Sequence, residues 1–322
     1  MMIYLNSKDI LNSITLDEIM DTIEEAYKIY TSNNFNMPDR IHVDNGNLTS
    51  LYMPCFTNEA FGTKILTIAP NNAKINKPIL DGVMVVNDVQ TGEIVCMMDG
   101  KTLTSVRTGA VGGVGLKHTT SKDVQSIGLI GTGAQGFYQI LYACKARTIK
   151  NVYLYNRTKN KAINLKIELE KELKNINIYV VDSSRELVEN SEVIITATTS
   201  SQPVIDNDKE LLKGKHIIAI GSYTPDMKEL PDALFEVVDK VIVDTDFAKE
   251  ESGDLCLPIK NNLIKSEDIE NMGNFLENNT NFNMKGKTTL YKSVGMGLFD
   301  LVVANKIYVK ALEKGIGQYI EL

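Results

Sequence analysis

A glycine-rich turn constrains what this chain can fold into more than any other stretch. In SIGLIGTGAQGFYQILYA (126–143), Gly131, Gly133 and Gly136 have the spacing G-x-G-x-x-G between an apolar run and a helical pattern. The first glycine permits a tight turn, the second lets the backbone approach a pyrophosphate, and the third allows contact between helix and strand. The N-terminus of the helix offers N–H groups to phosphates. The motif predicts a dinucleotide-binding site, and the alternative is a structural turn in a flavodoxin-like domain.

Apolar runs alternate with helical patterns through the chain around this turn. From about residue 124 onward the apolar runs are QSIGLI, NVYLYN, NIYVVD, EVIITA, HIIAIG and KVIVD. Such alternation predicts a parallel sheet covered by helices, so we expect an α/β fold with a Rossmann-type, doubly wound sheet. The asparagine-rich segment 271–287 interrupts the rhythm, and we expect it to be a surface loop.

The first third of the chain follows a different pattern of helices and short strands. Thr15 and Glu18 form the capping box of a first helix, and short strand-like runs follow it. Thr91-Gly92 predicts a hairpin turn, and 101–118 looks helical, with its glycines at points of close packing. We expect a helix over 293–314, and its length and apolar content suggest that it packs back onto this N-terminal part.

The bulk composition excludes several classes of protein. The formal net charge is −7, which argues against nucleic-acid binding. No apolar run approaches the roughly 20 residues that span a bilayer. The N-terminus MMIYLNSKDILNS has no basic region followed by an apolar run, so we expect no signal peptide. The isolated histidines lack metal-ligand spacing, and the dispersed cysteines suit reduced thiols. We expect a cytoplasmic protein with a small-molecule ligand, no metal site and no membrane partner.

The end of the second predicted strand bears on which dinucleotide binds. NAD sites usually carry Asp or Glu there, which accepts a hydrogen bond from the ribose 2′-hydroxyl. Here VYLY is followed by Asn156, Arg157 and Thr158. No carboxylate repels a 2′-phosphate, and Arg157 with Thr158 can bind one. We expect NADP(H) to be preferred, with NAD(H) as the other cofactor that fits; the alternative is a solvated basic start of a helix.

Three cations stand out upstream of the glycine turn. Arg40 opens a predicted strand, Lys64 precedes the apolar run ILTIA, and Arg107 lies among apolar residues of the predicted helix 101–118. A buried cation needs an anionic partner, and a substrate carboxylate would serve as one. Spacing alone leaves the alternative that each cation is structural or exposed.

Motifs along nearly the whole chain resemble the ornithine cyclodeaminase/mu-crystallin family. The matching pieces are Arg40, MP (53–54), the G-x-K of 62–64, TGEI and DGKTLTSVRTGA within 91–110, GLIGTGAQG (128–136), ITATTS (195–200), GSYTPDMKEL (221–230), ESGD (251–254) and KSVGMGLFDLVVA (292–304). The resemblance implies a Rossmann NAD(P)-binding domain, expected over 121–299. It also implies a second, α+β domain for substrate binding and dimerisation, expected over 1–120 and completed by the final helix at 300–322. A homodimer is expected on the same ground.

The resemblance further implies roles for individual residues. Arg40, Lys64 and Arg107 match the positions that hold the substrate carboxylate, and we take them as the catalytic set, with Lys64 as proton donor or relay. The expected cofactor-binding residues are Thr108, Gly131, Gly133, Ala134, Gln135, Gly136, Asn156, Arg157, Thr158, Thr196, Ala197, Thr198, Tyr223 and Ser293. Among them, Ala134 and Gln135 are expected over the pyrophosphate and Ser293 near the nicotinamide.

Two departures from the family pattern bear on the reaction. Ornithine cyclodeaminases carry an aspartate where this chain has Tyr223, and a substrate-binding glutamate where it has Leu51. Neither replacement offers a negative charge near neutral pH to a second amino group. The loop GSYTPDMKEL instead resembles that of ketimine reductases and Δ1-pyrroline-2-carboxylate reductases, and we interpret Asp226 as a residue that structures the loop.

These observations favour an NAD(P)H-dependent oxidoreductase that reduces the C=N bond of cyclic imino acids, as in the formation of L-proline from Δ1-pyrroline-2-carboxylate. Three alternatives stay open. The first is an ornithine cyclodeaminase, which is an ammonia-lyase. The second is an alanine dehydrogenase, and the third is a non-enzymatic protein that binds NADP and a small ligand.

Overall fold

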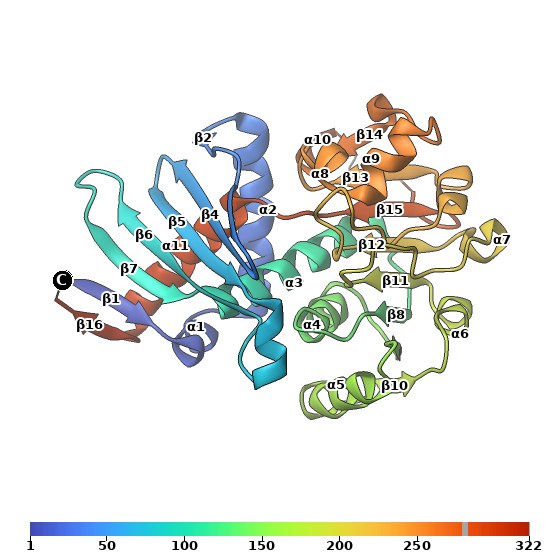
Figure 1. Ribbon diagram of the computed structural model, residues 1–322, viewed down its shortest axis with the longest axis horizontal. Helices are drawn as coiled ribbons and strands as arrows, with labels where there is room; N and C mark the ends of the chain where they lie inside the picture. Colours follow the sequence, from blue (N-terminus) through green and yellow to red (C-terminus); the bar gives the residue numbers. More distant parts are fainter. Residues whose placement is uncertain (279–282, 322) are drawn as a thin grey trace. The chain divides into compact units, whose positions relative to one another are not determined.

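The computed structural model describes residues 1–278 and 283–321, and these form two compact units. The first unit comprises residues 1–107 together with the chain from Met296 onward, and the second comprises Thr108–Gly295. Helix α3 (Gly100–Thr119) contains the junction between them. Because the final helix belongs to the first unit, the chain leaves that unit and returns to it (Figure 1).

The second unit is built on a parallel sheet whose strands follow the order β10-β9-β8-β11-β12-β15-β13-β14. Every pair of neighbouring strands in it is parallel. The strands are β8 (Ser126–Ile130), β9 (Asn151–Tyr155), β10 (Asn177–Val180), β11 (Val193–Thr196), β12 (His216–Ala219), β13 (Lys240–Val243), β14 (Ile269–Asn271) and β15 (Thr289–Lys292). The expected Rossmann-type, doubly wound sheet is confirmed.

Helices connect these strands, and the direction of winding reverses at β8. From β8 the chain continues to β9 on one side and later resumes at β11 on the other, so the carboxyl ends of β8 and β11 flank the topological switch point where doubly wound sheets bind ligands. The α-helices are α4 (Gly136–Ala146), α5 (Lys159–Glu172), α6 (Ser184–Asn190), α7 (Lys209–Leu212), α8 (Ala248–Glu251), α9 (Gly253–Lys260) and α10 (Met272–Asn278), with 3-10 turns η2 (Asp232–Glu236) and η3 (Ser266–Asp268).

Two expectations for the last part of this unit are wrong. The segment 271–287 is not a surface loop throughout, because α10 begins at Met272 and buries Met272 and Phe275; residues 279–282 lie outside the described residues. The final helix begins at Gly297 and not at residue 293, because the N–H groups of Val294 and Gly295 donate to Asp244 and Gly295 has a φ of 73°.

The first unit is a mixed sheet with the order β16-β1-β7-β6-β5-β4-β2, and β3 pairs with β4. Strands β1 and β7 are parallel, and the other pairs are antiparallel. The strands are β1 (Met2–Leu5), β2 (Phe35–Asn36), β3 (Ile41–Asn45), β4 (Leu48–Thr57), β5 (Ala60–Ile68), β6 (Leu80–Asp88), β7 (Ile94–Asp99) and β16 (Gln318–Ile320). A 3-10 turn, η1 (Pro70–Ile75), links β5 to β6.

Helices cover one face of this mixed sheet. They are α1 (Ser7–Ser13), α2 (Leu16–Ser32) and α11 (Gly297–Lys314). The predicted capping box of Thr15 and Glu18 starts α2, and Gly92 makes the predicted turn between β6 and β7 with a φ of 78°. Helix α11 packs on α2 and lies against β4, β5 and β6, as expected for a helix that returns to the N-terminal part (Figure 1).

The glycines of α3 mark points of close packing, as predicted. A Cβ at Gly113 would lie 2.7 Å from Cβ of Tyr142 on α4, and one at Gly115 would lie 2.2 Å from the ring of Tyr291 on β15. Real side chains do not tolerate such contacts, so the missing Cβ atoms let α3 approach α4 and the sheet. Among the described residues, no helix is long and apolar enough to cross a membrane.

Candidate active site

The glycine turn after β8 has the shape that a phosphate-binding loop needs. Gly131 has a φ of 98°, and a Cβ there would lie 2.6 Å from the carbonyl oxygen of Ala197. A side chain is therefore excluded at Gly131 by backbone conformation and by space. A Cβ at Gly133 would meet nothing within 4 Å, so the middle of the turn is open. Gly136 donates its N–H to the carbonyl of Gly133 at 3.0 Å and begins α4.

Two buried polar atoms lie beside this turn, and one of them, the Thr132 hydroxyl, can donate to a phosphate oxygen. The hydroxyl oxygen of Thr132 and the amide oxygen Oε1 of Gln135 are buried, and neither has a hydrogen-bond partner within the described part of the chain. Gly133 and Ala134 between them are exposed. A ligand that offers phosphate oxygens to the Thr132 hydroxyl and to the open backbone of the turn would satisfy groups that the protein leaves unpaired.

The residues after β9 divide into one that supports the turn and one that faces solvent. Asn156 accepts a hydrogen bond from the Thr132 N–H at 3.2 Å and donates to the Thr158 carbonyl at 3.1 Å. Arg157 is exposed, and across residues 1–278 and 283–321 its guanidinium has no ion pair. Asn156 therefore fixes the loop through its side chain, while Arg157 is the cation available to an anionic ligand.

The expected cofactor residues after β11, β12 and β15 are held by contacts within the second unit. Thr196 donates its hydroxyl to Glu229 at 2.9 Å, and Ser293 donates its hydroxyl to Asp244 at 2.6 Å. Ala197 donates its N–H to the Ile130 carbonyl at 2.9 Å. The expected residues Thr198 and Tyr223 belong to the same loops: the Thr198 N–H donates to Glu229, and Tyr223 packs against the hydrophobic core. Thr108, at the start of this unit, accepts a hydrogen bond from Gln139 through its carbonyl.

The first unit brings Lys64 and Arg107 together on one buried carboxylate. Lys64 Nζ donates to Asp300 Oδ2 at 2.7 Å, and Arg107 Nε donates to Asp300 Oδ1 at 2.8 Å. Asp300 lies on α11 and is fully buried, and only 1% of Lys64 and 6% of Arg107 is exposed. We expected a substrate carboxylate to be the anionic partner of these cations. In the structure, the protein's own Asp300 is that partner. Asp300 links β5, α3 and α11, which are distant in sequence.

Burial and neighbouring charges give Lys64 an unusual acidity. The pKa of Lys64 is lowered to about 7: desolvation is the largest cause, the charges of Arg107 and Arg40 act in the same direction, and Asp300 opposes them. Arg40, the third expected cation, is half-buried before β3, and its charge is among those that lower the pKa of Lys64. A lysine with a pKa near neutrality can hold or release a proton under physiological conditions.

The nearby thiol adds no second titrating group to this cluster. Cys55 on β4 is fully buried, and desolvation together with the charge of Asp300 raises its pKa to about 12. All four cysteines of the chain are free. In the described residues, no group of three or more histidine, cysteine or acidic side chains could hold a metal ion.

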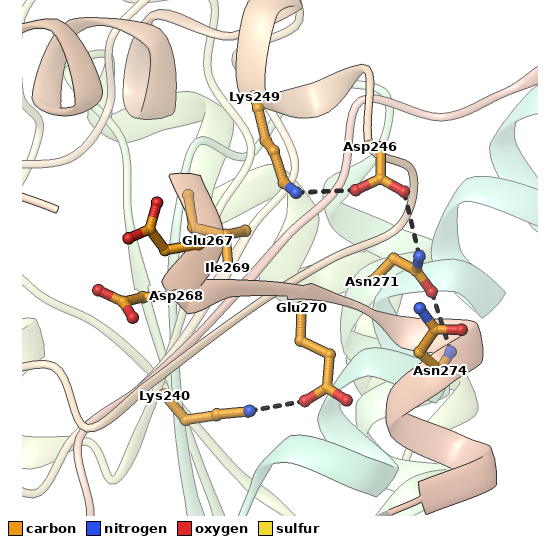
Figure 2. Close-up of a pocket in the computed structure, with 9 residues that line it drawn as sticks. All are labelled: Lys240, Asp246, Lys249, Glu267, Asp268, Ile269, Glu270, Asn271 and Asn274. Carbon is orange, nitrogen blue, oxygen red and sulfur yellow. Dashed lines mark hydrogen bonds and ion pairs between the residues drawn. The ribbon is translucent and has the colours of Figure 1, made fainter. Parts of the chain in front are cut away.

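A polar pocket of about 540 Å³ lies elsewhere in the second unit, beside β13 and β14. It is lined by Lys240, Asp246, Lys249, Glu267, Asp268, Ile269, Glu270, Asn271 and Asn274. Figure 2 shows that its cations face its own acids: Lys240 pairs with Glu270 at 2.6 Å, and Lys249 pairs with Asp246 at 2.8 Å. None of the residues predicted from the sequence lines this pocket, and both of its lysines are already paired with acids.

The family model for ornithine cyclodeaminase/mu-crystallin proteins matches residues 2–315. The chain belongs to this family. The motifs of the sequence implied this family. The chain has two units, one with the glycine turn and its parallel sheet and one with the clustered cations.

Full-length relatives within the family are similar to this chain in sequence and in structure. A Δ1-pyrroline-2-carboxylate reductase of Bacillus cereus is 34% identical, over 99% of this chain and 100% of its own. The Δ1-pyrroline-2-carboxylate reductase of Thermococcus litoralis in complex with NADH and L-proline is 30% identical with a TM-score of 0.92, covering 99% and 100% of the two chains. An archaeal alanine dehydrogenase dimer with bound NAD is 26% identical with a TM-score of 0.91, covering 100% and 99%.

Sequence reasoning missed Asp300, although a signal for it was present. Asp300 stands in the run GLFDLVVA, where its neighbours Phe299 and Leu301 are apolar. A single acid on the buried face of a helix implies a buried cation as its partner. The hydrophobic pattern of α11 therefore identifies Asp300 as a paired residue, but it does not say which cation is the partner.

Replacing Asp300 by asparagine should destabilise the first unit strongly. Asp300→Asn keeps the volume of the side chain but leaves Lys64 and Arg107 buried without an anion, which costs about 3–5 kcal/mol in comparable pairs. In urea denaturation, the lost free energy of unfolding should appear as a lower urea concentration at the midpoint of unfolding. The control is Asp182→Asn, which removes an exposed partner of Lys159 and should leave the midpoint unchanged. Equal midpoints for Asp300→Asn and the unaltered protein would contradict the role of Asp300.

Proposed function

We propose that this protein is an NAD(P)H-dependent reductase of cyclic imino acids that converts Δ1-pyrroline-2-carboxylate to L-proline. The observation that carries the proposal is the buried cluster of Lys64, Arg107 and Asp300, with Arg40 acting on it. Its cations suit a carboxylate, and one of them titrates near neutrality. The reductases of Bacillus cereus and Thermococcus litoralis, similar over the full chain, support the choice of substrate.

In this proposal the first unit binds the substrate and the second unit binds the cofactor. Arg40 and Arg107 hold the substrate carboxylate, for which a guanidinium is well suited. Lys64 holds the proton that the imine nitrogen takes up, because desolvation keeps the pKa of this lysine close to 7. A bound nicotinamide supplies the hydride. Fixing the carboxylate orients the imine and contributes much of the acceleration through positioning.

The same unit offers no partner for a second amino group on the substrate. Leu51 is buried on β4, where ornithine cyclodeaminases carry a substrate-binding glutamate. An ammonium group beside it would lose its hydration without gaining a charge partner. This observation supports reduction of an imino acid over cyclodeamination of ornithine. The four free cysteines fit the reducing conditions of the cytoplasm, where we place the protein.

The reaction is tested by mixing the purified protein with Δ1-pyrroline-2-carboxylate and NADPH or NADH and following absorbance at the wavelength of the reduced nicotinamide. The protein should oxidise the cofactor and form proline. Pyruvate with ammonia, and ornithine with NAD, should be turned over far more slowly. Release of ammonia from ornithine at a comparable rate, or turnover of pyruvate alone, would refute the proposed substrate.

Lys64 should set the pH dependence of this reaction. A proton donor must be protonated to act, so kcat/KM should be high below a pH of about 7 and fall above it, as the lysine loses its proton. Lys64→Ala should lower kcat by about 10²–10⁴-fold, the usual contribution of a general acid. Lys209→Ala, on the exposed surface, serves as the control. An unchanged kcat in Lys64→Ala would remove this lysine from the mechanism.

For the cofactor, we propose that NADP(H) is preferred through Arg157, with Thr158 beside it. Its exposed guanidinium lies after β9, where a 2′-phosphate is bound in sheets of this type. Arg157→Ala should weaken NADPH roughly tenfold or more, because a charge-assisted contact is lost, and should leave NADH nearly unchanged. Calorimetric titration with each cofactor measures the two affinities. Equal losses for NADPH and NADH would refute the assignment.

We propose further that the protein is a homodimer formed through the outer face of β3, β4 and β5. The register pairs Ile41 with Tyr52 and Val43 with Ser50, so alternate residues of these strands share one face. Ile41, Val43, Leu48, Tyr52 and Phe56 lie on that face and are exposed. Antiparallel sheets usually present polar residues to water, and a contiguous apolar face of this kind favours a protein partner. The archaeal alanine dehydrogenase dimer supports a second copy as that partner.

A charge placed at the centre of this face should separate the two copies. Tyr52→Glu should convert a dimer, twice 35.8 kDa, into a monomer in sedimentation velocity, because a carboxylate at the interface would be desolvated without a partner. Tyr179→Glu, on the exposed edge strand β10 of the other unit, is the matched control and should remain dimeric. A monomer in the unaltered protein would refute the proposed interface.

A further inference from the structure

Glu229 is a buried carboxylate that collects donors from two loops. It has no solvent exposure, and its Oε1 accepts the Thr198 N–H at 2.6 Å. Its Oε2 accepts the Gly221 N–H at 2.8 Å, the Ser222 N–H at 3.2 Å and the Thr196 hydroxyl at 2.9 Å. Burial raises the pKa of Glu229, and the charge of Lys292 and the hydrogen bond from Thr198 oppose this rise. Three of the four partners are backbone N–H groups, which can only donate, so the site suits a carboxylate.

These donors come from the ends of two adjacent parallel strands. Thr196 is the last residue of β11, and Thr198 follows it; Gly221 and Ser222 follow the end of β12. The two loops touch closely at this point, since a Cβ at Gly221 would lie 2.1 Å from the Thr198 carbonyl oxygen. Glu229 therefore fixes the two loops relative to each other at the carboxyl edge of the sheet.

A second layer of buried charges holds Glu229 in place. Asp254 on α9 accepts the N–H groups of Glu229 at 2.6 Å and Leu230 at 2.9 Å, and its other oxygen lies 3.2 Å from Lys292 Nζ. Asp254 and Lys292 have no solvent exposure. Lys292 is the last residue of β15, which pairs with β12, and it precedes Ser293, whose hydroxyl donates to Asp244. The ends of β11, β12 and β15 are thus joined through one set of charges.

Burial of so many charges at one edge of a sheet calls for a reason other than stability. An ion pair enclosed in protein gains little net free energy over an apolar replacement, whereas it fixes geometry well. The apolar core of the second unit already holds these strands together, and the network adds polar contacts only where the strands end. The backbone of the loops, not the sheet, is what the network orders.

We infer that Glu229 is a positioning residue for the nicotinamide end of the cofactor, because it sets the loops after β11 and β12. This inference rests on the proposed function, in which the glycine turn and the residues after β9 hold the adenosine and pyrophosphate end. Strands β11 and β12 lie on the other side of the switch point from β9, where a doubly wound sheet binds the second half of a dinucleotide. Glu229 itself does not touch the ligand; it acts through the Thr198, Gly221 and Ser222 backbone.

The test compares binding of NADH with binding of ADP-ribose, which lacks the nicotinamide, in Glu229→Gln. Glutamine has one oxygen and can keep the three contacts of Oε2, but its NH₂ group then faces the Thr198 N–H and releases that loop. Calorimetric titration should show NADH weakened roughly tenfold, the equivalent of one lost charge-assisted contact, and ADP-ribose within about twofold of the unaltered protein. A KM for the imine that stays constant while kcat falls is expected in the same variant.

The matched control is Glu192→Gln at the opposite edge of the same sheet. Glu192 accepts hydrogen bonds from the N–H groups of Gln125 and Ser126 just before and at the start of β8. It should change neither ligand's affinity. Thr196→Val removes one donor to Glu229 without changing the size of the side chain. Like Glu229→Gln, it should weaken the binding of NADH more than the binding of ADP-ribose. It decides the question if Glu229→Gln does not fold.

Equal losses of NADH and ADP-ribose, or no loss of either, in the folded variant would overturn the inference. Its failure is separable from failure of the proposed function, because the affinity ratio does not depend on turnover. A protein whose ratio shifts as expected but that reduces no imine keeps the inference and loses the proposed reaction. A protein that reduces the imine while the ratio stays constant loses the inference alone. Failure of the unaltered protein to bind NADH, NADPH or ADP-ribose would overturn both.

Discussion

The high free-energy cost of a buried charge without a partner determines how both units of this protein are built. In the first unit, Asp300 lies 193 positions along the chain from Arg107 and 236 from Lys64, and it contacts both. In the second, Glu229 collects donors that follow two different strands. Each acid makes its contacts only when distant segments are in place. Correct assembly of each unit is therefore a condition for pairing its charges, and the pairing selects that assembly.

The two buried clusters differ in the balance of their charges, and the difference matches what each is proposed to do. In the first unit, the two cations Lys64 and Arg107 share the single carboxylate of Asp300, so cations outnumber acids in this cluster. In the second unit, the acids Glu229, Asp244 and Asp254 outnumber Lys292, and backbone N–H groups take up the excess. An excess of cations suits a substrate carboxylate, whereas saturated acids fix the backbone.

Local patterns in the sequence predicted the parts of the fold that depend on neighbouring residues. The strand, glycine turn and helix over 126–143 were predicted correctly because the turn, the strand and the start of the helix lie within a few residues. Strand β15 was missed because its partners β12 and β13 are far away in sequence. Its four residues are also too few to show the alternation of apolar and polar residues that predicts a strand. Asp300 and Glu229 were missed for the same reason, since their partners cannot be read from spacing. The three cations were grouped by family resemblance, not by pattern.

Leu51 connects the choice of substrate to the acidity of the proposed proton donor. The register places Leu51 opposite Leu66 and Met53 opposite Lys64, so Leu51 lies on the same buried face of the sheet as the lysine. A glutamate at that position would bring a second anion to the cluster, which favours the protonated form of lysine and raises its pKa. The apolar side chain instead preserves the desolvation that is the largest cause of the lowered pKa of Lys64. In the proposed reaction, Leu51 thus offers no partner to a second amino group and leaves the lysine able to give up its proton near neutral pH.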